Sequence, residues 1–378
     1  MSRQTLSVSV DDPINARILS VSEDQIAGFS PTPFHQISEM SGVPLETVLE
    51  RIRAMLEAGV IRRVRQTILA TSLAPGALVA WSVPQDRLDA AFDWMAQEDP
   101  FSGHVVIRST DPGTPGWQYR LWTTLKVPQG FSIEKHCQLL MRITGATAYL
   151  LLPAKKLFTL GVGHVRRRGL EPGSKTDQPG KAIDATIIEL SDLEWRVLAA
   201  LKRELAPQEI TPDPWRLRAQ EAGVSEQEFF DVARQLNQRG VIGRFSTFLE
   251  HVKKVAGNPR VTRFNALFHW RVPPGREMEA GKEIGRFHIM THAYWREGGP
   301  EFANVNLMGV AHGTDKDLLL AHKAAMDDHL ASQGIPVSYT NVFWGGRSQI
   351  KPSEILPQAY RQWCQQQGVD PETMRDSS

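Results

Sequence analysis

"SGVPLETVLERIRAMLEAGVIRRV", residues 41–64, occurs a second time in this chain as "AGVSEQEFFDVARQLNQRGVIGRF", residues 222–245. Two shorter stretches recur in the same order: "AWSVP" at 80–84 as "HWRVP" at 269–273, and "HVVIR" at 104–108 as "HAYWR" at 292–296. One such match would carry little weight, but three matches at similar offsets indicate a duplication. The chain is therefore expected to contain the same architecture twice.

The first part of each copy has the pattern of a helix-turn-helix. In the first copy, residues 34–40 predict a short helix, 41–43 a turn and 44–58 a longer helix that ends at Gly59. Apolar residues of the longer helix follow the helical period: Leu45, Val48, Leu49, Ile52 and Leu56. The second copy predicts helices over 215–222 and 225–239, with Ser225 and Glu228 as a capping box.

The second part of each copy alternates strands and helices in the order β-α-β-β-α-β. The segments are 77–84, 87–97, 104–110, 119–127, 133–143 and 146–153 in the first copy, and 264–273, 278–286, 289–297, 304–313, 316–332 and 337–344 in the second. This order predicts a ferredoxin-like domain, an antiparallel four-stranded sheet with both helices on one face. The predicted fold class is α+β, a tandem duplication of a winged helix-turn-helix domain followed by a ferredoxin-like domain.

These patterns divide the chain into six segments. A polar stretch rich in Gly, Pro and charge, "RRRGLEPGSKTDQPGKAID", indicates a linker between the copies. The predicted segments are helix-turn-helix domain 1 (1–68), ferredoxin-like domain 1 (69–165), linker (166–185), helix-turn-helix domain 2 (186–250), ferredoxin-like domain 2 (251–350) and C-terminal tail (351–378).

Composition excludes several classes of protein. The chain has 378 residues with a formal net charge of +1, so it has no overall attraction to nucleic acid or membranes. Cys137 and Cys364 are the only cysteines, which excludes a disulfide scaffold and a cysteine-rich zinc site. There is no apolar segment long enough for a membrane span and no apolar N-terminal signal. We therefore expect a cytoplasmic protein without membrane contact.

The predicted strands carry an unusual number of polar side chains. Because side chains alternate between the two faces of a strand, His292, Tyr294 and Arg296 share one face. On the following strand Asn304, Asn306, Met308 and His312 are expected to share a face, with Val305, Leu307 and Ala311 on the other, against the helices. In the first copy, the same alternation groups His104 with Arg108, and Lys126 with Trp122. The polar set is expected to line a face on which a second sheet can pack. No metal site is expected, because no carboxylates or cysteines accompany His288 and His292.

A helix-turn-helix followed by a ferredoxin-like domain resembles the Lrp/AsnC family of amino-acid-responsive transcription regulators. The resemblance covers nearly the whole chain, twice, and implies an AsnC-type ligand-binding domain and DNA binding through each second helix. The first residues of those helices are mostly acidic, including Glu46, Glu50, Glu226 and Glu228, and phosphates repel carboxylates. We therefore expect no specific DNA binding, and a packing and dimerisation role for the helix-turn-helix. A ligand-responsive transcription regulator stays the alternative.

Four motifs together resemble the sirohaem decarboxylase branch of these proteins. They are "GVIRRV", "AWSVP", the H-x-Y-x-R strand at 292–296 and the strand that keeps Asn306, Leu307, His312 and Gly313. The resemblance implies removal of carboxyl groups from acetate side chains of sirohaem, giving didecarboxysirohaem in haem-type biosynthesis. Lys126 stands in the first copy where the family has the histidine of its H-G motif.

The resemblance also implies site residues. His292 and His312 are the expected catalytic residues, one orienting a carboxylate and the other donating a proton. The expected substrate-binding residues are Arg296, Tyr294, Asn306, Arg62, Arg63, Arg65, His104, Arg108 and Lys126. Lys126 is expected to keep the high pKa of an ordinary lysine, so that it is a poor acid at pH 7. No cofactor is expected beyond the iron of the tetrapyrrole, and the two copies are expected to form an intramolecular pseudo-dimer, with a further homodimer as an option. A non-catalytic tetrapyrrole-binding protein is a second alternative.

Overall fold

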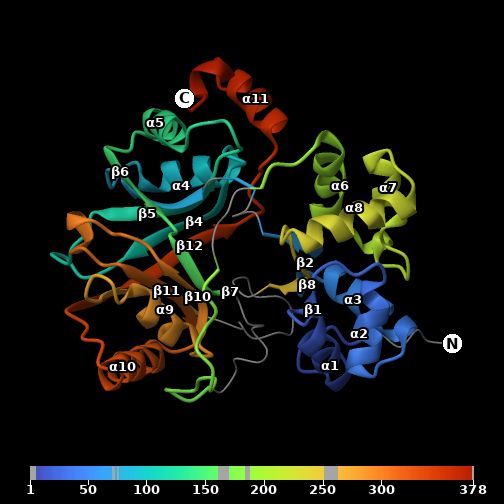
Figure 1. Ribbon diagram of the computed structural model, residues 1–378, viewed down its shortest axis with the longest axis horizontal. Coiled ribbons are helices and arrows are strands. Elements are labelled where there is room, and N and C mark those ends of the chain that lie inside the picture. The colour runs from blue at the N-terminus through green and yellow to red at the C-terminus, as the bar shows by residue number, and fades with distance from the viewer. Residues whose placement is uncertain are drawn as a thin grey trace. The chain divides into compact units, whose positions relative to one another are not determined.

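The computed structural model of this chain describes residues 6–69, 73–74, 76–160, 170–183, 188–250 and 263–376. These residues form two compact units, and Figure 1 labels most of their helices and strands. Unit one comprises residues 6–69 and 188–250, and unit two comprises the other described residues. Unit one therefore contains both helix-turn-helix segments and unit two contains both ferredoxin-like segments. The boundaries of the six segments stay predictions.

Unit one is built from two helix-turn-helix motifs and a small sheet. Its helices are α1 (Pro13–Ser22), α2 (Pro33–Ser41), α3 (Leu45–Glu57), α6 (Asp192–Lys202), α7 (Arg216–Ala222) and α8 (Glu226–Gln238). Gly42 and Gly223 adopt left-handed backbone angles, with φ of 64° and 70°, in the turns that the sequence places there. The strands β1 (Ile26–Ala27), β8 (Ile242–Leu249) and β2 (Ile61–Ile68) pair antiparallel in that order. Each copy contributes one long strand, so the sheet joins the two copies.

Unit two contains two ferredoxin-like modules. Module one consists of β3 (Gly76–Ser82), α4 (Leu88–Gln97), β4 (Ser102–Ser109), β5 (Tyr119–Lys126), α5 (Ile133–Thr144) and β6 (Ala148–Pro153). Module two consists of β9 (Phe264–Arg271), α9 (Glu277–Gly285), β10 (Met290–Trp295), β11 (Leu307–Gly313), α10 (Lys316–Ser332) and β12 (Tyr339–Ile350). The strand orders are β6-β3-β5-β4 and β12-β9-β11-β10, which is the ferredoxin-like arrangement in both modules. The predicted fold class is thus confirmed.

The chain at the C-terminal end of each module also pairs with the other module. The first half of β12 pairs with β9, and its second half pairs with β4 of module one. In module one, β6 is followed after two residues by β7 (Lys156–Leu160), which pairs with β10 of module two. The nine-stranded sheet therefore begins at β6 and ends at β7, which are neighbours in the chain. Since these two ends must lie close together, the sheet curls back on itself and its two halves face each other.

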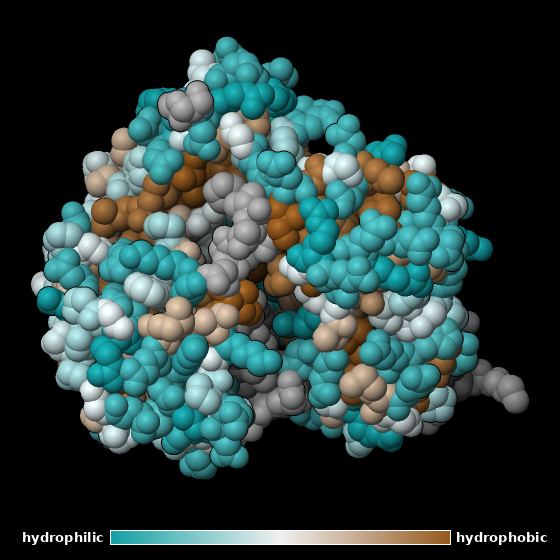
Figure 2. Space-filling model, viewed as in Figure 1, coloured by the Kyte–Doolittle hydropathy of each residue, from teal (hydrophilic) through white to brown (hydrophobic). Residues whose placement is uncertain are grey.

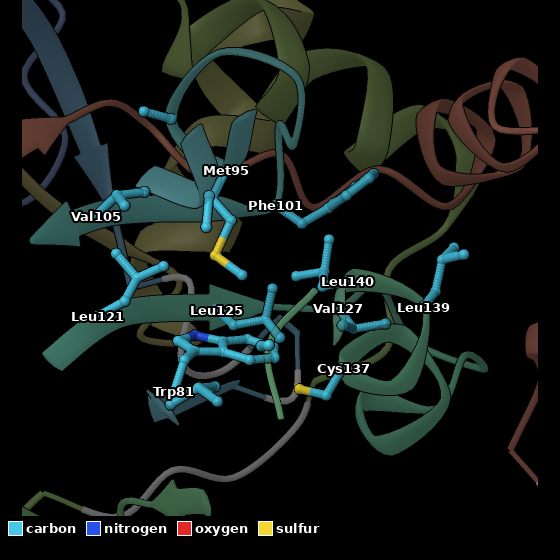
Figure 3. Close-up of a cluster of buried hydrophobic side chains, with 14 of the residues drawn as sticks. Trp81, Met95, Phe101, Val105, Leu121, Leu125, Val127, Cys137, Leu139 and Leu140 are labelled. Carbon is cyan, nitrogen blue, oxygen red and sulfur yellow. The ribbon is translucent and has the colours of Figure 1, made fainter. Parts of the chain in front are cut away.

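Three apolar clusters fill the layers of unit two. One lies between the sheet of module one and its helices, with Trp81, Met95, Phe101 and Leu140 at its centre (Figure 3). The second cluster lies between the sheet of module two and its helices α9 and α10, and it includes Phe268, Trp270 and Met326. The third combines residues of both modules on the inner faces, among them Ala80, Trp122, Leu267, Met308 and Phe343. The sheet face that the sequence predicts to be free is therefore covered by the other module. On the outer surface, hydrophilic residues cover α10 and α11 (Figure 2).

The C-terminal segment, predicted from the sequence only as a tail over 351–378, completes the core of module one. Helix α11 (Pro357–Gln366) buries Tyr360, Trp363 and Cys364 in the first cluster. The Trp363 indole donates to the carbonyl of Glu98 at 2.9 Å, and the Tyr360 hydroxyl lies 3.0 Å from Nδ1 of His136. The tail of the second copy is thus a structural part of module one.

The predicted linker is described only over residues 170–183, and its remaining residues lie outside the described part of the chain. In the described part, Lys175 pairs with Phe287 and Ile183 with Leu157, so this stretch runs along unit two. Among all described residues, no helix combines the length and the apolar character needed to cross a lipid bilayer.

Candidate active site

The inner faces of unit two bring together most of the residues that the sequence singles out. His292 and Tyr294 share the inner face of β10, as predicted, with ring centroids 6.0 Å apart and ring planes at 29°. Arg296 follows directly after β10, and its guanidinium lies 4.4 Å from the centroid of the Tyr294 ring. The predicted alternation is therefore confirmed for these three side chains.

Arg296 and Lys126 place two positive charges from different modules near each other. The Arg296 guanidinium donates to the backbone carbonyl of Leu152, and the residue is 8% exposed. Burial, with a smaller contribution from the Arg296 charge, lowers the pKa of Lys126 to about 8. The prediction of an ordinary high lysine pKa is thus wrong, because this ammonium is largely withdrawn from water beside another cation. A lysine with this pKa can exchange a proton near neutral pH.

Arg108 is the third buried cation of the inner faces. It is 4% exposed, and burial alone lowers its pKa to about 9. Its Nη1 donates to Asn265 Oδ1 at 3.1 Å and lies 3.4 Å from the carbonyl of Phe343. Among the described residues, no carboxylate forms an ion pair with Arg108, Lys126 or Arg296. Buried cations are costly unless an anion compensates them, so this face is suited to an anionic ligand.

His312 reaches the same network from β11. Its Nε2 lies 3.1 Å from Asn265 Nδ2, and its Nδ1 lies 3.4 Å from Thr291 Oγ1. Asn265 therefore connects His312 of module two with Arg108 of module one. Asn265 is not among the residues predicted from the sequence, although the alternation of β9 places it on the inner face with Leu267 and His269.

His269 is the most deeply buried histidine of the inner faces. Its ring contacts Trp122, Phe302 and Phe343, with centroid distances of 6.2, 5.7 and 5.0 Å. Both ring nitrogens lack a hydrogen-bond partner among the described residues. Burial lowers the pKa of His269 to about 3, helped by the Arg108 charge, so this histidine is a neutral core residue.

Asn306 lies apart from the inner-face group. Strand β11 begins at Leu307, and the Asn306 amide bonds the backbone N–H and C=O of Val272, both at 2.9 Å, and Glu277 at 3.1 Å. The prediction that Asn306 shares a face with Met308 and His312 is therefore wrong. The regular alternation starts one residue later, and the amide clamps the chain after β9 to α9.

Two groups of predicted residues remain, His104 on the inner face of β4 and three arginines in unit one. His104, on β4, has its Nε2 2.9 Å from the Ser348 hydroxyl of β12. Arg62, Arg63 and Arg65 lie on β2 in unit one, where Arg63 Nε is 3.3 Å from a Glu204 carboxylate oxygen. Burial lowers the pKa of Arg65 to about 10, and the other two arginine pKa values are lowered for the same reason. Among the described residues, no group of three or more His, Cys, Asp or Glu side chains could hold a metal ion.

Replacing Lys126 with methionine is expected to stabilise the protein in the absence of ligand. Because the pKa of Lys126 is lower in the folded than in the unfolded state, the charged form opposes folding at pH 7. Allowing for solvent screening, Lys126→Met should raise the free energy of unfolding by about 1–2 kcal/mol near pH 7 in urea titrations. The gain should shrink as the pH rises from about 8 to 10.5. The exposed Lys155→Met is the control, and an equal gain from it would contradict the account.

Comparisons with known proteins agree with this architecture. The family model "AsnC-like ligand binding domain" matches residues 73–159, and "Siroheme decarboxylase NirDL-like HTH domain" matches residues 29–62. A sirohaem decarboxylase of Hydrogenobacter thermophilus is 25% identical over 287 residues, which are 75% of this chain and 79% of that protein. The sirohaem decarboxylase alpha subunit of Desulfovibrio desulfuricans is 33% identical over 136 residues, 35% of this chain and 72% of that subunit.

A solved structure shows the same fold over nearly the full length. It is the crystal structure of the sirohaem decarboxylase NirDL in co-complex with an iron-uroporphyrin III analogue. It matches with a TM-score of 0.65 at 18% identity, over 94% of this chain and 99% of that chain. Fold, family models and relatives together identify the chain as a member of the sirohaem decarboxylase family.

Proposed function

We propose that this chain removes carboxyl groups from the acetate side chains of sirohaem, or of a closely related iron tetrapyrrole, to give didecarboxysirohaem. The observation that carries this proposal is a set of three cations on the inner faces, the buried Arg108 and Arg296 and the half-buried Lys126, that lack carboxylate partners among the described residues. A polycarboxylate supplies the missing anions. The relative that was solved with an iron-uroporphyrin III analogue supports a tetrapyrrole as the ligand.

The cations of both modules are proposed to hold the substrate. Arginine forms paired, charge-assisted hydrogen bonds with carboxylates, and such bonds are strong where water is excluded. Tyr294 supports Arg296 through the contact of its ring, and His104 offers a further polar group on β4. That Arg62, Arg63 and Arg65 also bind carboxylates stays a prediction, which Arg65→Ala tests separately. The proposal needs no cofactor, because iron belongs to the substrate.

The chemistry requires the loss of CO₂ and the gain of one proton. The bond between the acetate methylene and its carboxylate carbon breaks, CO₂ leaves, and the electron pair stays on the methylene carbon. A proton donor then converts that carbon to a methyl group. We assign His292 as the donor and His312 as the residue that orients the reacting carboxylate. Lys126, with a pKa of about 8, lies on the same inner faces and is the competing candidate for proton donation.

We also propose that the two modules of one chain take the place of two subunits, and that the helix-turn-helix segments do not bind DNA specifically. The exchange of last strands between the modules supports the first point. The acidic, exposed side chains of Glu46 in α3 and Glu228 in α8 support the second, because phosphates repel them. A transcription regulator is therefore not favoured.

Binding of the substrate should depend on Arg296. Anaerobic titration with sirohaem, followed by the Soret absorption, should show binding about tenfold or more weaker for Arg296→Ala, since a hydrogen bond to a charged group contributes roughly 1.5–3 kcal/mol. Arg347→Ala is the matched control, because Arg347 is exposed on β12 and pairs with Asp89 and Asp93. Equal weakening by the two variants would show that the inner faces are not the binding site.

Turnover should depend on His292 more than binding does. Proton donation acts in the transition state, whereas many carboxylate contacts determine the affinity. After anaerobic incubation with sirohaem, the mass of the product should show loss of CO₂ with the wild-type protein. His292→Ala should reduce the rate about 10²–10⁴-fold with little change in binding.

Lys126→Ala provides the comparison for this assay. It should weaken binding mainly, because the proposal makes Lys126 a partner of a carboxylate. If Lys126→Ala instead abolishes turnover at saturating sirohaem while His292→Ala stays active, Lys126 is the proton donor and the assignment of His292 is wrong.

A further inference from the structure

A row of four residues crosses the middle of the nine-stranded sheet. Arg108 on β4 pairs with Gly345 on β12, Gly345 pairs with Asn265 on β9, and Asn265 pairs with His312 on β11. Strand β12 lies between β4 and β9 in the sheet, and Figure 1 shows it beside β4. Directly paired residues of neighbouring strands point to the same face. Arg108 of module one and His312 of module two therefore share the inner face, three strand spacings or roughly 14 Å apart along the row.

Gly345 leaves room for a side-chain contact between the two modules. Because it has no side chain, the guanidinium of Arg108 extends past it and donates to Asn265 Oδ1 at 3.1 Å. A Cβ atom at position 345 would lie 3.1 Å from Asn265 Cβ and 3.2 Å from its Cγ. Such contacts are tighter than ordinary van der Waals packing, so a larger residue would displace Asn265. At the next position, a Cβ on Gly346 would meet nothing closer than the Ile107 carbonyl at 3.5 Å.

The donors and acceptors of this row determine the state of His312. A guanidinium only donates, so the carbonyl oxygen of Asn265 must face Arg108 and its NH₂ group must face His312. The Nε2 atom of His312 therefore accepts a hydrogen bond and carries no proton. On the other side of the ring, Thr291 Oγ1 donates to the Val310 carbonyl at 2.7 Å and can accept from Nδ1–H at 3.4 Å. This arrangement of donors and acceptors favours a neutral His312 with its proton on Nδ1.

We propose that Asn265 is a positioning residue for the decarboxylation, which it serves by holding His312 neutral and linking it to Arg108. This role in turnover rests on the proposed function, whereas the protonation state of His312 does not. With its Nε2 engaged as an acceptor, His312 has no proton to deliver from that atom. The network therefore separates the role of His312 from that of the proton donor: His312 is a fixed, uncharged group whose Nδ1–H is its one remaining donor, and the proton for the methylene carbon has to come from another group.

The protonation state of His312 can be measured in the resting protein. Histidine labelled with ¹⁵N in the ring should show, for the residue that disappears in His312→Gln, a protonated Nδ1 and an unprotonated, hydrogen-bonded Nε2. Asn265→Asp keeps the size of the side chain but offers only acceptors, so Nε2 should become protonated. Gln349→Glu makes the same amide-to-carboxylate change at an exposed position of β12 and should leave the His312 signals unchanged.

The rate of turnover should fall when Asn265 is removed or displaced. Asn265→Ala should lower kcat roughly tenfold to a hundredfold, as is typical for a residue that acts through another, with KM within about threefold. Gly345→Ala should lower kcat in the same direction and alter the His312 signals, while Gly346→Ala, one residue along the same strand, should do neither.

The experiments test the protonation state of His312, the role of Asn265 in turnover and the proposed function separately. A proton on Nε2 in the wild-type protein, or an unchanged His312 spectrum in Asn265→Asp, would overturn the proposal. Unchanged kcat in Asn265→Ala would refute the role in turnover. If the spectra behave as expected but the wild-type protein releases no CO₂ from sirohaem, the hydrogen-bonded row stands and the proposed function fails.

Discussion

The exchange of last strands between the two ferredoxin-like modules is the constraint on which unit two depends. Strand β12 completes the sheet of its own module and then pairs with β4 of module one, and β7, which follows β6 of module one, pairs with β10 of module two. Without this exchange, each module would present an open sheet edge and a half-polar face to water. Because of this exchange, the inner faces of the two modules meet. Between them lie polar side chains from both modules, together with the apolar residues Trp122, Leu267 and Met308.

This arrangement leaves positive charge inside the protein. Arg108 and Lys126 come from module one and Arg296 comes from module two, and burial lowers the pKa of each. An interior selected only for stability would contain apolar residues or paired charges at these positions. Uncompensated cations reduce the free energy of unfolding of the free protein, and an anionic ligand that neutralises them gains the corresponding binding energy.

The two modules differ in the side chains that they contribute. Ala80 of module one corresponds to His269 in module two, and Lys126 of module one corresponds to His312 in module two.

Sequence patterns predict those parts of the structure that local periodicity determines. The helices α2, α3 and α10, the ferredoxin-like strand order, and the shared face of His292 and Tyr294 follow from such patterns. The lowered pKa of Lys126 could not be predicted in this way, since it depends on burial and on Arg296, which is distant in the sequence. The role of Asn265 depends on Gly345 and Arg108, whose strands meet only through the exchange of β12. For Asn306 the alternation failed because the strand starts one residue later.

The central claim is that the buried cations of both modules hold the carboxylates of a tetrapyrrole between the inner faces of the sheet. An experimental structure of the protein with an iron tetrapyrrole polycarboxylate, such as iron-uroporphyrin, tests it most directly. The account predicts carboxylate oxygens within hydrogen-bonding distance, about 2.7–2.9 Å, of Arg296 and of at least one of Lys126 and Arg108. A tetrapyrrole bound with all of its carboxylates away from these three side chains would contradict the account.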